Sequence, residues 1–208
     1  MTGFDFAFAL FTLVLGLAVA ENVSGFARVM RLHARARAGK ADGVRVGWLT
    51  PLLAVLVLLN QITLWHQGYA VRNGLPFSYL TLLIILAIVV AHYLFSSLVW
   101  PEDPAEWPDF DAYYEQHNRL ILSGLLIINI AVMLTAQPYA PGPTAAQEAA
   151  MGSEANFIAS IALLSAFVLM LALIFVKSRV LNALLLVLVI AAILGGAITI
   201  AMLGLTPV

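Results

Sequence analysis

The side chains best suited to chemistry in this sequence lie inside long apolar runs. Glu21 lies seven residues before Arg28, and His92 lies eight residues before Trp100. At a helical rise of about 1.5 Å per residue, these spacings place the carboxylate about 10 Å and the imidazole about 12 Å from one membrane boundary. A charged side chain at the centre of a membrane helix costs about 2.5–3.5 kcal/mol, so Glu21 requires a partner, a proton or water.

Five further polar side chains lie in this layer or near the membrane midplane: Asn22, Ser96, Asn60, Gln61 and Asn129. A carboxylate beside an imidazole in a low dielectric suits proton handling, and the amides could coordinate an ion along the same path. The alternative is structural, because hydrogen bonds between membrane helices contribute about 0.6–2 kcal/mol each. Glu21 could also turn toward Arg28, two helical turns along the same face. Both interpretations stay open at the level of sequence.

The elements that position these residues follow from composition. The chain of 208 residues is 62% hydrophobic and 10% charged, whereas a soluble domain is about 45–50% apolar and about 25% charged. Lipid must therefore surround most of the chain. We predict an all-α fold, a six-helix transmembrane bundle forming a single domain over 1–208. The predicted spans cover about 4–27 with a helical extension to 38, 50–71, 76–100, 117–136, 154–176 and 180–204.

The distribution of basic residues predicts the direction of these spans. The first, third and fifth loops hold nine of the ten Lys and Arg residues. The positive-inside rule therefore places these loops in the cytoplasm and both termini outside, in a multi-pass cell-membrane protein. The first loop begins with a basic arm, Arg28, Arg31, Arg35 and Arg37, for which we predict contact with the anionic lipids of the bilayer and no nucleic-acid partner.

An acidic segment on the same predicted side precedes the fourth span. Its residues Asp109, Asp111 and Glu115, with His117, allow three interpretations. They could pair with the basic arm, at about 0–1 kcal/mol for each exposed pair. They could bind a divalent cation through oxygen ligands. The interpretation we favour is an acidic cap at an interfacial helix start. At the second span, the dipeptide 50–51 (Thr-Pro) predicts an N-cap followed by a first-turn proline.

Several functional devices are absent from the sequence. There is no cysteine, no phosphate-binding loop, no HExxH and no GxSxG, so we assign no catalytic residue, no cofactor and no metal, and favour a protein that is not an enzyme. The small residues Gly16, Ala20 and Ser24 form a stripe on the first span. We favour helix packing within one chain as its role, with a homo-oligomer seam as the alternative.

Four segments carry a resemblance to known proteins: ENVSGFARVMR (21–31), GWLTP (47–51), WPEDP (100–104) and DFDAYYEQH (109–117). With them, the chain resembles a group of small bacterial integral membrane proteins that carry no assigned activity. The resemblance covers roughly the first 120 residues. It implies a location in the bacterial inner membrane and no catalytic residue.

Three function classes remain open on these observations. The first, which we favour, is a small channel or transporter for protons, ions or a small solute, with Glu21 and His92 lining the path. The second is a structural or accessory membrane subunit that acts through helix packing and cytoplasmic loops. The third is a membrane-embedded or lipid-handling enzyme with its site at the cytoplasmic interface.

Overall fold

The computed structural model describes residues 3–39, 45–72, 74–76, 78–140 and 153–202. The regular elements in these ranges are helices, and the prediction of an all-α fold is confirmed. The helices are α1 (Gly3–Arg37), α2 (Leu49–Ala70), α3 (Tyr79–Ser97), α4 (Phe110–Ala136), α6 (Ser153–Phe175) and α7 (Arg179–Met202), with short 3-10 turns η1 (Pro104–Glu106) and η2 (Gln137–Tyr139). The last residues of the predicted sixth span, 203–204, lie outside the described residues.

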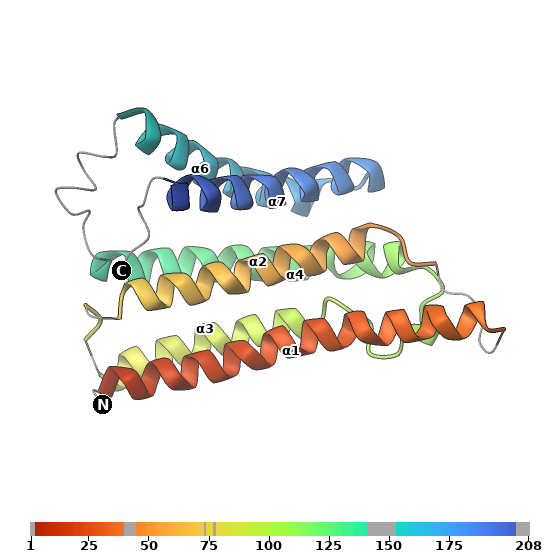
Figure 1. Cartoon of the computed structure of the whole chain (residues 1–208), viewed down its shortest axis with the longest axis horizontal. Helices are drawn as coiled ribbons and strands as arrows, with labels where there is room; N and C mark the ends of the chain where they lie inside the picture. Colours follow the sequence, from red (N-terminus) through yellow and green to blue (C-terminus); the bar gives the residue numbers. More distant parts are fainter. Residues whose placement is uncertain (1–2, 40–44, 73, 77, 141–152, 203–208) are drawn as a thin grey trace.

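The helices form three layers of two (Figure 1). One outer layer holds α1 and α3, the middle layer holds α2 and α4, and the other outer layer holds α6 and α7. We call the end at which α1 finishes in Arg28, Arg31, Arg35 and Arg37 the arm end, and the opposite end the N-terminal end. Within the first two layers, α2 contacts α1 and α4, and α3 contacts the same two helices. The helices α2 and α3 therefore face each other diagonally across a four-helix bundle.

Hydropathy supports a membrane location for this bundle. Within the described residues, α1, α2, α3, α4 and α7 are long and apolar enough to cross a membrane, whereas the described apolar stretch of α6, Leu164–Phe175, is shorter. Many large apolar side chains face outward, such as Leu13, Ile62 and Leu134 at more than 60% exposure. Outward apolar faces are expected where the solvent is lipid. A multi-pass membrane protein is thus supported, and the sixth span and the orientation stay predictions.

Two helix starts differ from the predictions. The helix α4 begins at Phe110, whereas the predicted span begins at 117. The Phe110 N–H donates to the Arg45 carbonyl oxygen, and the Asp109 carboxylate accepts from the N–H of Asp111, so both contacts fix the earlier start. The predicted N-cap role of Thr50 is wrong. The N-cap position is Trp48, and Thr50 is the second residue of α2. Its hydroxyl donates to the Phe110 carbonyl oxygen at 2.8 Å.

The small-residue stripe on α1 does not face the other helices of the chain, as the favoured interpretation required. Gly16, Ala20 and Ser24 are exposed, and a Cβ added at Gly16 would meet nothing within 4 Å. Packing within one chain therefore does not explain this stripe, and a seam between copies stays a prediction. The buried face of α1 carries Ala18 and Asn22 instead.

Candidate functional site

The structure divides the predicted pathway residues into two groups. Glu21 and Asn22 take separate positions near the middle of α1. The other five lie on the inner faces of α2, α3 and α4, and we call them the polar cluster: Asn60, Gln61, His92, Ser96 and Asn129.

Glu21 pairs within its own helix. Its Oε1 lies 3.2 Å from NH2 of Arg28, and the two side chains are 32% and 33% exposed. This is the turn toward Arg28 that the sequence allowed as an alternative. The contact between Glu21 and His92 is not formed, because neither ring nitrogen of His92 has a hydrogen-bond partner among the described residues. The charge of Glu21 is thus offset by the first arginine of the arm. It is not presented to the centre of the bundle.

Asn22 joins three segments at the arm end. Its Nδ2 donates to the Ala54 carbonyl oxygen on α2 at 3.1 Å, and its Oδ1 accepts from the Trp100 indole N–H at 2.8 Å. Asn22 is 1% exposed, and a Cβ added at Gly25, one turn along, would overlap the Trp100 ring. Trp100, which lies beyond the end of α3, therefore packs directly on the backbone of α1. The role of Asn22 is to fix this packing.

The polar cluster contains two pairs that connect different helices. Gln61 Nε2 donates to Ser96 Oγ at 2.7 Å, which connects α2 to α3 across the diagonal of the four-helix bundle. Asn60 Nδ2 donates to Asn129 Oδ1 at 3.3 Å, and Asn129 Nδ2 donates to the Leu125 carbonyl oxygen within α4. The cluster therefore lies on the axis of the bundle.

The cluster also holds polar atoms without a partner. His92 is fully buried, and both of its ring nitrogens lack a hydrogen bond within the described residues. The same is true of Gln61 Oε1 and Asn60 Oδ1. A buried polar group left unpaired costs about 1–3 kcal/mol. Two amide oxygens and one imidazole can offer acceptors to a small donor such as water, a hydrated proton or a cation.

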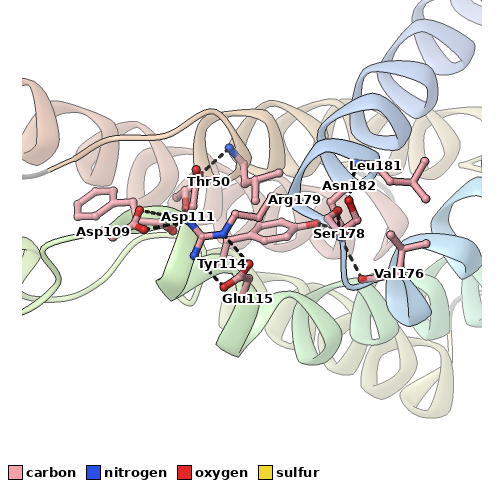
Figure 2. A network of polar contacts seen from close by, with 12 residues as sticks. Thr50, Asp109, Asp111, Tyr114, Glu115, Val176, Ser178, Arg179, Leu181 and Asn182 are labelled. Carbon is pink, nitrogen blue, oxygen red and sulfur yellow. Dashed lines mark hydrogen bonds and ion pairs between the residues drawn. The ribbon is translucent and has the colours of Figure 1, made fainter.

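A second polar network lies at the arm end (Figure 2). Arg179, the first residue of α7, binds Glu115 through two nitrogens and Asp109 through a third, at 3.0 Å. Beside it, the Tyr114 hydroxyl donates to Asn182 Oδ1, and Asn182 Nδ2 donates to the Val176 carbonyl oxygen. These contacts fasten the α6–α7 layer to the start of α4.

Two side chains of the acidic segment at the start of α4, Asp109 and Asp111, have defined roles. Burial acts to raise the pKa of Asp109, but hydrogen bonds from Arg179 and from the Asp111 N–H outweigh it, so the pKa lies below its ordinary value of 3.8. The carboxylate of Asp111 accepts from the Leu49 N–H at 3.2 Å and so caps the start of α2 from α4. Among the described residues, no three His, Asp or Glu side chains are placed to hold a metal ion.

Sequence reasoning missed Arg179, Asn182 and Trp100. The signal for Arg179 was present, because the predicted topology already placed the third and fifth loops on one side. Asn182 is a polar residue in the first turn of a very apolar helix, which is a general indication of a buried contact. No sequence signal pointed from Trp100 to Asn22.

Comparison of the chain with models of known protein families, with curated protein sequences and with solved structures finds no match. The resemblance drawn from the sequence therefore stays a prediction.

Proposed function

We propose that the protein passes protons, ions or a small polar solute across a membrane, with the polar cluster at the narrow point of the path. The observation that supports this proposal most is His92, which is fully buried and has two unpartnered ring nitrogens on the bundle axis. Ionisable side chains are rare inside membrane bundles, and those that occur often mark the path of an ion or substrate. A neutral imidazole also carries one N–H donor and one acceptor nitrogen, so it can bond a passing species from either side.

The path differs from the one expected from the sequence. Glu21 is not part of it, because its carboxylate pairs with Arg28 at the edge of α1. The unpartnered amide oxygens of Gln61 and Asn60 take its place as groups that can accept a hydrogen bond or coordinate a cation. A passing species would then exchange its hydration for these oxygens and for the imidazole.

A structural membrane subunit is the second candidate, and a specific observation favours it. The amide of Gln61 already bonds Ser96, and the amide of Asn60 already bonds Asn129, so part of the cluster acts as a link between helices. Such links stabilise bundles whether or not anything passes between them. The two candidates differ in whether His92 is needed for flux.

The deciding experiment is flux into proteoliposomes that contain a pH-sensitive dye, with imposed proton and potassium gradients. His92→Phe keeps an aromatic ring, somewhat larger than imidazole, and removes both nitrogens. His66→Phe makes the same change at an exposed position of α2 and serves as the control. We expect flux in the wild type and in the control, and a loss of about tenfold or more in His92→Phe, equivalent to at least about 1.4 kcal/mol in barrier height. Equal flux in all three would show that His92 is not part of the path, and no flux in folded wild type would favour the structural subunit.

We also propose that the arm end faces the cytoplasm and that the arm binds anionic lipid, as in a bacterial inner-membrane protein. The charge bias of the loops supports this, and Arg31, Arg35 and Arg37 are exposed. Because the chain has no cysteine, single-cysteine variants can test it. Arg35→Cys should react with an impermeant maleimide only after permeabilisation of the cells. Tyr79→Cys, at the N-terminal end, should react in intact cells.

A further inference from the structure

A cavity of about 450 Å³ lies at the N-terminal end of the four-helix bundle. Its walls come from α1, α2, α3 and α4 and are almost entirely apolar; they include Phe8, Phe11, Leu64, Ile85, Ile88 and Val132. The volume falls in the range of about 300–1,000 Å³ that is typical of small-molecule sites. None of the polar-cluster residues belongs to the lining.

The lining residues define a base and a mouth. On α3 the lining extends from Ser78 to Ile88, ten residues or about 15 Å of helix. Phe11 and Val132 are 6% and 7% exposed, so they mark the base. Leu80 on α3 and Leu134 on α4 also line the cavity, yet they are 65% and 66% exposed. The cavity therefore opens sideways between α3 and α4, onto the apolar outer face of the bundle.

Three of the four side-chain hydroxyls in the cavity lining are already hydrogen-bonded within the protein. The hydroxyls of Ser78 and Thr81 bond each other at 2.8 Å, and the Thr135 hydroxyl donates to the Ala131 carbonyl oxygen at 2.7 Å. A buried water needs two to four polar partners, and apolar cavities stay dry or take apolar guests. Water thus gains little in this cavity, whereas hydrocarbon keeps an apolar environment when it enters.

From this geometry, we infer that the cavity binds one acyl chain of a membrane phospholipid, which enters from the bilayer between Leu80 and Leu134. Hydrocarbon is the species present at a mouth flanked by two exposed leucines in a bilayer. The length of the lining along α3 suits an extended chain. This inference goes beyond the proposed function and does not depend on it, because a chain could occupy the cavity in a channel or in a structural subunit alike.

The test uses the full chain reconstituted in nanodiscs with a phospholipid that carries a diazirine midway along one acyl chain. After illumination, labelled positions are mapped by mass spectrometry. We expect label on Phe11 and Val132, which lipid on the outer surface of the bundle does not reach. Label confined to exposed residues such as Leu83 and Leu86 would overturn the inference.

Cavity-filling variants sharpen the result. Ile84→Trp fills the cavity from α3, and Leu83→Trp places the same ring on the exposed face of the same helix. Label on Phe11 and Val132 should fall by at least about fivefold in Ile84→Trp, because a filled cavity has no room for the chain, and should not change in Leu83→Trp. If Ile84→Trp does not elute as folded protein, Thr81→Phe serves in its place. Equal label in the filling variant and in Leu83→Trp would contradict the inference.

Discussion

The guanidinium of Arg179 binds both carboxylate oxygens of Glu115, with Nε 2.6 Å from Oε1 and NH2 2.9 Å from Oε2. This two-point contact joins the first residue of α7 to the second turn of α4, two elements far apart in the sequence. Paired N–H···O bonds of this kind fix orientation as well as distance. The α6–α7 layer is therefore held in one register against the middle layer.

Reversing the charge of Arg179 tests this contact. Arg179→Glu should lower the melting temperature, because it places a third carboxylate beside Glu115 and Asp109. The double variant Arg179→Glu, Glu115→Arg should recover part of the loss. Thermal melting in detergent measures both. Lys177→Glu, an exposed charge reversal two residues away, is the control, and an equal loss there would show that the contact with α4 is not the cause.

The ion pair of Asp109 should make stability depend on pH. The pKa of this carboxyl is lower in the folded protein than its ordinary value of 3.8, so the pair stabilises the fold fully above that value. As the pH falls through the lower, folded value, the carboxylate is protonated and the contribution is lost. The gap in melting temperature between wild type and Asp109→Asn should therefore shrink below about pH 4. A gap that stays constant down to pH 3 would contradict this account.

Removing the amide of Asn22 should destabilise the arm end. Asn22→Leu leaves the indole N–H of Trp100 and the carbonyl oxygen of Ala54 without this partner in a buried position. The expected loss in the free energy of unfolding is about 1–3 kcal/mol. Equilibrium unfolding in mixed micelles provides the measurement. Val23→Leu, at a 52% exposed position next to it, should change stability by much less.

Two glycines of α1 provide a matched pair. Gly25→Ala should destabilise by about 1–3 kcal/mol, because the added Cβ overlaps the Trp100 ring. Gly16→Ala meets nothing within 4 Å and should be neutral or stabilising by up to about 1 kcal/mol, since alanine favours helix. The same unfolding measurement serves for both, and equal effects would show that Trp100 yields freely to the added carbon.

The pairing of Glu21 with Arg28 predicts that the Glu21 carboxylate is not needed for flux. Glu21→Gln should leave flux in proteoliposomes close to that of the wild type, because the carboxylate pairs with Arg28 and lies apart from the polar cluster. His92→Phe should remove the flux under the same conditions. Loss of flux in Glu21→Gln with protein that remains folded would return Glu21 to the pathway.

Sequence reasoning placed the helices well and the contacts poorly, and Glu21 illustrates why. The depth of a residue follows from counting along the helix, and that count put Glu21 and His92 in one layer. Contact also requires the rotation of each helix about its axis. In a soluble protein the apolar stripe gives that rotation, but in lipid the outer face is as apolar as the core. Nothing in the sequence therefore showed that Asn22, one residue on, faces inward while Glu21 lies at the edge.

The members of the polar cluster could be picked out from the sequence, but their pairing could not. Asn60, Gln61 and Asn129 stand out because amides are rare inside spans. Which amide meets which depends on the diagonal placement of α2 and α3, a property of tertiary packing. The sequence favoured an acidic cap at a helix start for this segment, and Asp109 does cap α4 locally through the N–H of Asp111. The cap that Asp111 gives to α2 through the distant Leu49 N–H could not be predicted, because it depends on tertiary packing.

The contact of Arg179 with α4 also bears on the order in which the protein is made. The ribosome synthesises α1 to α4 first, so Glu115 and Asp109 have no contact with Arg179 until the α6–α7 hairpin emerges. A nascent chain halted before Arg179 has two carboxylates, Glu115 and Asp109, that lack this guanidinium, and a tyrosine hydroxyl, Tyr114, that has not yet met Asn182. Docking of the final hairpin thus completes assembly, and a chain truncated at 176 should be a substrate for membrane quality-control proteases.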